Sequence, residues 1–295
     1  MILVTGASGL AGGSVLGAVR KRGAARVRAM YRSGEDAKKA AGGGVGVEAV
    51  VADFADLGSL GAALAGVETV YLVCGPVPEL VQLESNMIEA CVAAGVKHVV
   101  LNSALGAGDY AKSFPSWHRK VEDKLRGTRL AWTILRPNSF MQNITAFFAP
   151  SIRTQGAFYS SVGNARTSFI DVGDIAEVAA NALTEPEKHA RKIYELNGPE
   201  AVTYVELAQR ISRVAGKPVQ YVDGSMDAQR MWLLEMGMPA WQVDALVELQ
   251  QFYVNGQGGD VDEVLAGLLG HAPRGLEAFL RANAEAFRET GAATA

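Results

Sequence analysis

Residues 2–12 read Ile-Leu-Val-Thr-Gly-Ala-Ser-Gly-Leu-Ala-Gly. The apolar run at residues 2–5 predicts a short strand, and residues 12–21 predict a helix. Between them the glycines Gly6, Gly9 and Gly12 follow the spacing Gly-x-x-Gly-x-x-Gly. The first glycine permits a tight turn, the second lets the backbone approach a diphosphate, and the third lets the helix pack close to the strand.

This loop is suited to the diphosphate of a dinucleotide, because a helix N-terminus presents free N–H groups and a positive dipole end. The hydroxyl of Ser8 would add one more donor. A glycine-rich turn without a ligand is the alternative, but the preceding strand and the following helix favour a dinucleotide. The expected contacts come from the loop and the start of the helix: Gly6, Ala7, Ser8, Gly9, Leu10 and Ala11.

Short apolar runs alternate with helical patterns through the first half of the chain, which predicts a parallel sheet covered on both faces. The predicted strands are 2–5, 26–31, 47–52, 69–73, 97–102 and 132–135. The predicted helices are 12–21, 37–41, 57–65, 79–94 and 116–126. Right-handed crossovers then give an α/β fold with a Rossmann-type, doubly wound parallel sheet.

The pattern changes after Pro137 and becomes mainly helical. Asp171 or Asp174 caps a helix that runs to about Leu183. Thr203-Tyr-Val-Glu206 is a capping box that begins another helix, which Gly216 ends. We therefore expect a dinucleotide-binding domain at residues 1–150, completed by 165–197, and a smaller, mainly helical substrate domain at 198–295.

Composition limits the classes of partner. The 295 residues are 49% hydrophobic and 20% charged, with a net charge of −3 and no block of like charge, so no nucleic-acid surface is expected. No apolar run approaches about 18 residues, and no signal peptide is visible, so no membrane partner is expected. Two cysteines are too few for a disulfide scaffold, which favours a reducing, cytoplasmic compartment. No metal site is predicted, and the protein is expected to be a monomer or a homodimer.

Residues after the second and third strands bear on which dinucleotide is bound. Arg32 stands where an acid would hold the ribose 2′-hydroxyl of NAD, and its guanidinium suits a 2′-phosphate instead. We therefore expect NADP, with NAD still possible because Glu35 and Asp36 follow. Asp53 could accept a hydrogen bond from the adenine amino group with Phe54 beside it, or Asp53 could simply cap the helix near Leu57.

Together these features resemble the short-chain dehydrogenase/reductase superfamily, and more narrowly its atypical NmrA-like branch, which includes triphenylmethane reductase and a quinone oxidoreductase. The resemblance covers most of the chain to about Val222 and, more loosely, residues 271–287. It is carried by Val4-Thr-Gly-Ala-Ser-Gly-Leu-Ala-Gly12, Tyr31-Arg32, Asp53-Phe54, Val100-Leu-Asn-Ser-Ala104, His118-x-x-x-Glu122, Thr133-Ile-Leu-Arg-Pro-Asn-Ser-Phe140, Phe169-Ile-Asp-Val-Gly-Asp-Ile-Ala176 and Leu196-Asn-Gly-Pro199.

The resemblance implies site residues at the carboxyl ends of the later strands. Cys74 and Gly75 after the fourth strand would border the cofactor, and Ser103 after the fifth matches the active-site serine of the superfamily. Pro137, Asn138 and Phe140 after the sixth strand would flank the nicotinamide and the substrate.

The chain departs from the superfamily at the Tyr-x-x-x-Lys pair that protonates a carbonyl oxygen. Counted back from Glu122 in the register of the superfamily's extended members, this pair falls on Phe114 and His118, and phenylalanine cannot transfer a proton. His118 would hold the ribose or polarise a substrate oxygen, or it is a polar residue bonded to backbone or water. Tyr110, four residues before Phe114, is a weaker candidate for a displaced acid.

A site without a strong acid favours acceptors whose reduced form is weakly basic, such as a quinone, a stabilised carbocation or a conjugated enone. The first hypothesis is thus an NADPH-dependent oxidoreductase acting on a quinone-like or conjugated aromatic acceptor. The alternative is a non-catalytic protein that senses NAD(P). A group of apolar residues would roof a flat substrate or simply form core: Phe140, Met141, Phe147, Phe148, Met231, Trp232, Met236, Met238 and Trp241.

Overall fold

The computed structural model describes residues 1–24, 26–41, 46–108 and 113–288. The chain forms two compact units, of which the first comprises Met1–Pro137 and Val172–Leu196 and the second comprises Asn138–Asp171 and Asn197–Ala295. Residues 138–150, expected in the first domain from the sequence, lie in the second unit, and the chain returns to the first unit at Val172.

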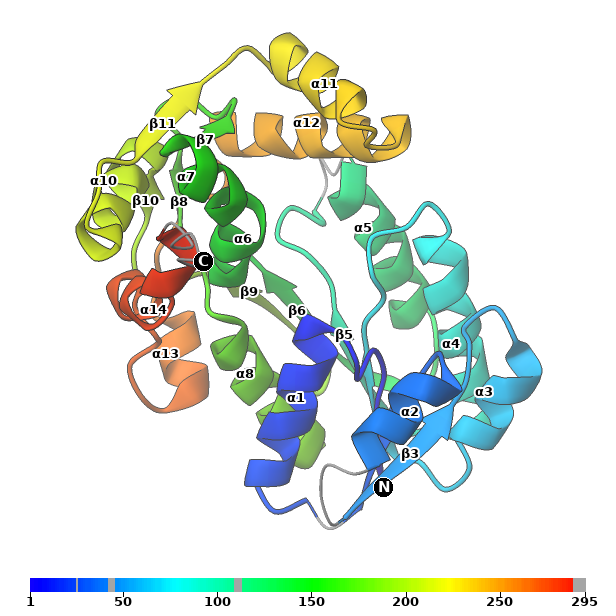
Figure 1. The fold of residues 1–295 in the computed structure, drawn as a ribbon. Helices are drawn as coiled ribbons and strands as arrows, with labels where there is room; N and C mark the ends of the chain where they lie inside the picture. The colour runs from blue at the N-terminus through cyan, green and yellow to red at the C-terminus, as the bar shows by residue number, and fades with distance from the viewer. Residues whose placement is uncertain (25, 42–45, 109–112, 289–295) are drawn as a thin grey trace, which may run out of the picture. The chain divides into compact units, whose positions relative to one another are not determined.

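The first unit is built on a seven-stranded sheet in the order β3-β2-β1-β4-β5-β6-β9, with every neighbouring pair parallel (Figure 1). Its strands are β1 (Ile2–Val4), β2 (Val27–Tyr31), β3 (Val47–Val51), β4 (Thr69–Leu72), β5 (His98–Asn102), β6 (Ala131–Pro137) and β9 (Lys192–Leu196). The six strands predicted between residues 2 and 135 are confirmed. The edge strand β9 was not predicted, because its alternating Lys-Ile-Tyr-Glu-Leu lacks the continuous apolar character of a central strand.

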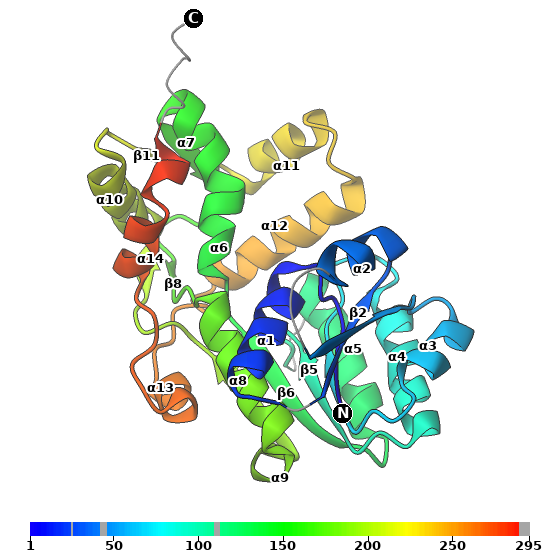
Figure 2. The ribbon, with the colours of Figure 1, turned by 60° about the horizontal axis from the view of Figure 1, so that its bottom comes forward.

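Helices cover both faces of this sheet (Figures 1 and 2). One face carries α1 (Leu10–Lys21) and α8 (Val172–Thr184), and the other carries α3 (Leu57–Ala63), α4 (Leu80–Ala94) and α5 (Ser113–Arg126). The shorter helices of the unit are α2 (Gly34–Ala41) and α9 (Pro186–His189). Beneath α3, α4 and α5 lies a core that includes Leu72, Met87, Ile88, Leu101 and Ile134, all fully buried. Each such side chain contributes about 1.5–3 kcal/mol by leaving water.

The strand order reverses between β1 and β4, because β1 continues to β2 on one side and has β4 as its other neighbour. In open α/β sheets a ligand binds in the crevice at the carboxyl ends of the strands at such a reversal. Thr5, directly after β1, fixes this point. Its buried hydroxyl donates to the Tyr71 carbonyl at 3.0 Å and accepts the Val73 backbone N–H at 3.0 Å.

The second unit contains helices and two small sheets. Its strands are β7 (Ala157–Ser160), parallel to β11 (Gln220–Asp223), and β8 (Arg166–Thr167), antiparallel to β10 (Val202–Thr203). Its helices are α6 (Met141–Asn143), the π-helix η1 (Ile144–Phe148), α7 (Ala149–Gln155), α10 (Tyr204–Ala215), α11 (Met226–Glu235), α12 (Ala240–Val254), α13 (Val264–Leu269), α14 (Leu276–Ala282) and η2 (Ala284–Phe287). These four strands of two to four residues are too short to produce a recognisable alternation of apolar and polar residues in the sequence.

The capping box predicted at α10 is confirmed. The Thr203 hydroxyl accepts the Glu206 N–H at 3.1 Å, and the Glu206 carboxylate accepts the Thr203 N–H at 2.8 Å. The helix ends at Gly216, which adopts a φ of 72° that a residue with a Cβ disfavours. Across the described parts of the chain, every helix is too short or too polar to span a bilayer.

Candidate functional site

The glycine loop brings α1 directly onto the end of β1. A Cβ on Gly12 would lie 2.2 Å from the Gly6 carbonyl oxygen and 2.5 Å from that of Thr5, so no larger residue fits there. Gly6 has a φ of +59°, which makes the tight turn that a side chain would strain. The third glycine therefore performs the close packing expected from the sequence.

The first turn of α1 is open at its N-terminus. The N-cap residue is Gly9, which supplies no side-chain cap, and no acidic residue occupies the first turn. Ser8 and Gly9 are exposed, and Leu10 is 49% exposed. The first-turn N–H groups therefore lack the usual capping partner. This glycine cradle, residues 6–12, fits the diphosphate of a dinucleotide, because its exposed helix N-terminus presents N–H groups that no side chain caps.

Arg32 follows β2 with an exposed guanidinium. Within the described residues this group forms neither a hydrogen bond nor an ion pair, and its charge acts on the thiol of Cys74. The strand ends that carry these two residues therefore meet at one edge of the sheet. An unpaired guanidinium at this edge is suited to an anionic group of a ligand.

The alternative role considered for Asp53, helix capping, belongs to its neighbour Asp56. The Asp56 carboxylate accepts the N–H groups of Gly58 at 3.0 Å and of Ser59 at 3.3 Å, and so caps α3. Among the described residues, the Asp53 carboxylate accepts one hydrogen bond, from the nearby Ala55 N–H at 2.8 Å. Beside it, the half-buried ring of Phe54 packs against the core. Asp53 thus keeps acceptor capacity for an adenine amino group, a role that stays a prediction.

Cys74 lies half-buried after β4, beside the exposed Gly75. Burial and the nearby Glu84 carboxyl raise the pKa of the Cys74 thiol to about 12, so the group is an unreactive thiol at neutral pH. This agrees with the inert thiol favoured by the sequence. Its place at the carboxyl end of β4 is the one expected for a residue that borders the cofactor.

Glu84 is a feature that sequence reasoning missed. It lies on α4 with its side chain fully buried, and among the described residues neither carboxyl oxygen has a hydrogen-bond partner of ordinary geometry. Burial raises the pKa of Glu84 to about 8, and the nearby Cys74 backbone N–H offsets only part of that rise. The group is therefore protonated at neutral pH. The available signal was an acid on the apolar face of the helix, in register with Leu80, Met87 and Cys91.

Ser103 takes part in a buried network that joins four elements. Its hydroxyl donates to Glu122 at 2.6 Å, and Arg136 binds both oxygens of that carboxylate, at 2.9 and 2.7 Å. Arg136 also contacts Glu195 at 3.2 Å. Ser103 is 3% exposed, and Glu122 is fully buried. To donate to a substrate the Ser103 hydroxyl would have to leave Glu122, and its catalytic role stays a prediction.

Phe114, His118 and Glu122 share one face of α5 at a spacing of four residues. Phe114 is half-buried, with its ring edge-on to Trp117 at 5.2 Å between centroids. The Nδ1 atom of His118 is buried and has no hydrogen-bond partner within the described residues. Burial lowers the pKa of His118 to about 4, so its imidazole is neutral at physiological pH. The other candidate acid, Tyr110, lies outside the described residues.

The segment after β6 places Asn138 and Phe140 in the second unit, while Pro137 ends the strand in the first. The Asn138 amide nitrogen lies 2.8 Å from the Ser168 hydroxyl, 3.0 Å from the Asn197 side-chain oxygen and 3.0 Å from the Gly258 carbonyl. This amide therefore ties four segments of the unit together. Phe140 is half-buried and forms a β-bridge with Ile170. Whether either residue contacts a cofactor stays a prediction.

The sequence pattern of the NmrA-like family matches residues 1–280. This chain belongs to the NmrA-like family. It is 34% identical over 290 residues to an NAD(P)H azoreductase of Xenophilus azovorans, covering 97% of this chain and 99% of the relative.

Solved structures of the family agree with the fold. An NADPH-dependent quinone oxidoreductase of Escherichia coli, complexed with NADPH, superposes with a TM-score of 0.87 at 29% identity, over 95% of this chain and 98% of the other. The Citrobacter triphenylmethane reductase complexed with NADP(H) gives 0.85 at 26% identity, over 96% of this chain and all of the other. The expected membership and the expected Rossmann-type fold are confirmed.

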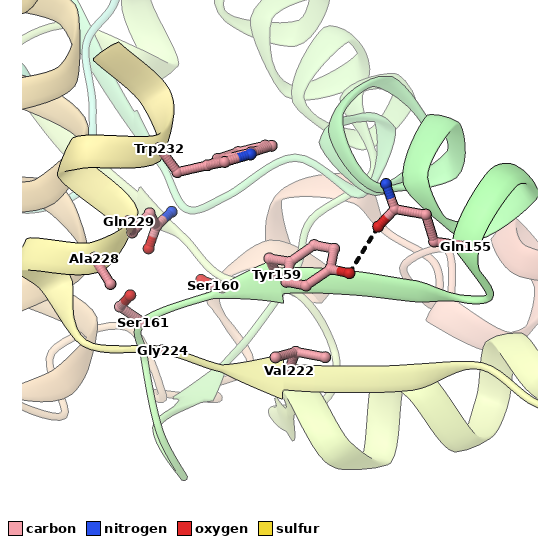
Figure 3. Close-up of a pocket in the computed structure, with 9 residues that line it drawn as sticks. All are labelled: Gln155, Tyr159, Ser160, Ser161, Val222, Gly224, Ala228, Gln229 and Trp232. Atoms are coloured by element: carbon pink, nitrogen blue, oxygen red, sulfur yellow. Dashed lines mark hydrogen bonds between the residues drawn. The ribbon is translucent and has the colours of Figure 1, made fainter. Parts of the chain in front are cut away.

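In this NmrA-like chain six of the nine apolar residues proposed to roof a flat substrate fall into three groups, and the other three, Phe140, Met238 and Trp241, are half-buried. Met141 and Phe148 pack in the core of the second unit. Phe147, Met231 and Met236 are exposed. Trp232 lines a pocket within that unit, which the sequence could not locate (Figure 3).

Proposed function

We propose that this chain is an NADPH-dependent reductase of quinone-like or conjugated aromatic acceptors. The observation that carries the proposal is the glycine cradle, whose uncapped first-turn amides lie at the strand reversal of a Rossmann-type sheet. The azo, quinone and dye reductases described above support both the cofactor and the class of acceptor. When bound, NADPH supplies a hydride. The chain binds it, orients it and excludes water.

The cradle binds the diphosphate of the cofactor. The backbone N–H groups of Ser8, Leu10 and Ala11 donate to the phosphate oxygens, and the dipole of α1 favours the negative charge of the diphosphate. Arg32 pairs with the 2′-phosphate that distinguishes NADP from NAD, because its exposed guanidinium has no competing partner in the described chain. Asp53 and Phe54 meet the adenine, and Cys74 and Gly75 border the cofactor where β4 ends.

The chemistry of the acceptor follows from the acids that the site lacks. Phe114 has no proton to give, and His118 is a neutral imidazole. The Ser103 hydroxyl already donates its hydrogen bond to the Glu122 carboxylate. A simple ketone needs a proton as hydride arrives, because a free alkoxide is strongly basic. A quinone or an extended conjugated system forms a weakly basic product that water can protonate, so this site favours such acceptors.

The remaining assignments are part of the same proposal. The first unit binds the cofactor, and the second unit is the substrate-side domain. Because both cysteines are free thiols in the structure, we place the protein in a reducing, cytoplasmic compartment.

The test compares acceptors that differ in the basicity of their products. Oxidation of NADPH by the purified protein would be followed by loss of absorbance with a naphthoquinone, an azo dye and a saturated ketone. We expect turnover with the quinone or the dye, and a rate at least about 100-fold lower with the ketone. A matched comparison of NADPH with NADH tests the role of Arg32.

Two outcomes would overturn the proposal. Tight binding of NADPH without turnover of any conjugated acceptor would favour the non-catalytic sensor instead. Equal rates with the quinone and the saturated ketone would show that a proton donor operates in the site after all.

A further inference from the structure

A pocket of about 320 Å³ lies wholly within the second unit, between the β7–β11 pair and α11 (Figure 3). Its lining residues are Gln155, Tyr159, Ser160, Ser161, Val222, Gly224, Ala228, Gln229 and Trp232. Its volume is at the lower end of the range for small-molecule sites, which begins at about 300 Å³. A ligand of one or two fused rings fits such a volume.

Two aromatic rings form the walls. Tyr159 and Trp232 are 6.3 Å apart between ring centroids, with their planes inclined at 36°. A flat ring stacked between two others needs about 7 Å, twice the usual contact distance of carbon atoms. The side chains are 41% and 48% exposed, so a small rotation of either one opens the gap. Val222, directly paired with Tyr159 across the two strands, adds apolar surface on the same side.

Two residues of the lining each carry a polar side-chain atom that is shielded from solvent and lacks a partner. The Oγ atom of Ser161, a residue that is 5% exposed, makes no hydrogen bond within the described chain, and neither does the buried Oε1 atom of Gln229. Buried polar groups in folded proteins normally have partners. The other polar pair is satisfied, because the Tyr159 hydroxyl donates to the Gln155 side-chain oxygen at 2.7 Å.

The lining contains no Asp, Glu, Lys, Arg or His. A charged ligand would therefore leave water without an opposite charge to receive it, and such transfer is strongly unfavourable. The pocket selects a neutral molecule with a flat apolar body and a hydroxyl group at one edge.

We propose that this pocket binds a neutral hydroxyaromatic compound of one or two rings, with its ring plane against Tyr159 and Trp232 and its hydroxyl at Ser161 and Gln229. With the Ser161 and Gln229 side chains turned toward the cavity, the hydroxyl donates to the Gln229 side-chain oxygen and accepts from Ser161. This supplies each unpartnered atom with a hydrogen bond. The inference does not rest on the proposed reductase function, since no residue that lines the pocket is among those assigned to the cofactor or to proton transfer.

The test is calorimetric titration of the full chain with a naphthol, without any dinucleotide. A naphthoate serves as the charged analogue of the same shape. The variants are Trp232→Leu, which removes one wall, and Gln229→Leu, which removes the acceptor. Met231→Leu is the matched control, because Met231 is a 61% exposed neighbour on α11 that does not line the pocket. Thermal melting establishes that each variant is folded.

We expect the naphthol to bind and the naphthoate to bind at least about tenfold more weakly. Trp232→Leu should weaken naphthol binding about tenfold and Gln229→Leu several-fold, while Met231→Leu leaves it unchanged. The inference is overturned by an absence of naphthol binding to the wild type. It is also overturned if both folded pocket variants bind as tightly as the wild type.

Discussion

Replacing Gly12 by alanine perturbs the glycine cradle without changing charge or polarity. The new Cβ would lie 2.2 Å from the Gly6 carbonyl oxygen and 2.5 Å from that of Thr5, and both obstacles are backbone. Neither can rotate away as a side chain could. The start of α1 must therefore retreat from β1 by about 1 Å to restore van der Waals contact.

Such a retreat acts on both stability and binding. An overpacked contact of this kind costs about 1–3 kcal/mol of folding stability. First-turn N–H groups moved by about 1 Å no longer reach the diphosphate at hydrogen-bonding distance. Losing one or two hydrogen bonds to a charged group, at about 1.5–3 kcal/mol each, weakens NADPH binding about 100-fold.

The assay is fluorescence titration with NADPH, accompanied by thermal melting. The matched control is Gly17→Ala in the same helix, where an added Cβ meets nothing within 4 Å. That variant should bind NADPH like the wild type and gain up to about 1 kcal/mol of stability, because alanine favours a helix interior over glycine. If Gly12→Ala binds NADPH within about threefold of the wild type, the diphosphate does not lie on this helix, and the reasoning is refuted.

Two further predictions concern ionisable side chains of the first unit. Arg32→Ala should weaken NADPH binding about 10- to 100-fold and leave NADH nearly unchanged, because only NADPH carries the 2′-phosphate; equal losses for both cofactors in parallel titrations would contradict this role. The second concerns Glu84, whose pKa is raised from 4.5 to about 8 in the folded state. As pH rises, the Glu84 carboxyl therefore loses its proton in the unfolded chain first, and the free energy of unfolding falls between these two pH values. Glu84→Gln keeps the side chain neutral, so the decrease in the free energy of unfolding between about pH 5 and about pH 8 should shrink by up to a few kcal/mol. Urea unfolding at both pH values measures this decrease, and an unchanged pH dependence would contradict a buried protonated acid.

Much of the fold was predictable because its signals are local. A run such as Val99-Val-Leu101 is buried on both faces and must be apolar throughout, and the capping box of Thr203 and Glu206 lies within four residues. The strand β9 and the four short strands of the second unit were not predictable, because each takes its place from a partner strand distant in the sequence.

The site divides in the same way. The glycine cradle and Arg32 follow directly from a strand–loop–helix pattern, and a helix N-terminus needs no distant partner to present its amides. The network of Ser103, Glu122 and Arg136 joins positions up to 33 residues apart in sequence. Sequence motifs contain all three residues, but only the interatomic distances showed that the Ser103 hydroxyl donates a hydrogen bond to the Glu122 carboxylate.

The sequence by itself thus determined six of the seven strands of the main sheet, the dinucleotide loop and the loss of the usual tyrosine, because each depends on residues near one another in the chain. Tertiary structure alone decided the neutral state of His118, the protonated Glu84 beside Cys74 and the pocket between Tyr159 and Trp232. The physical reason is that the pKa of a buried group, and the opening between two rings, depend on which distant segments exclude water from them.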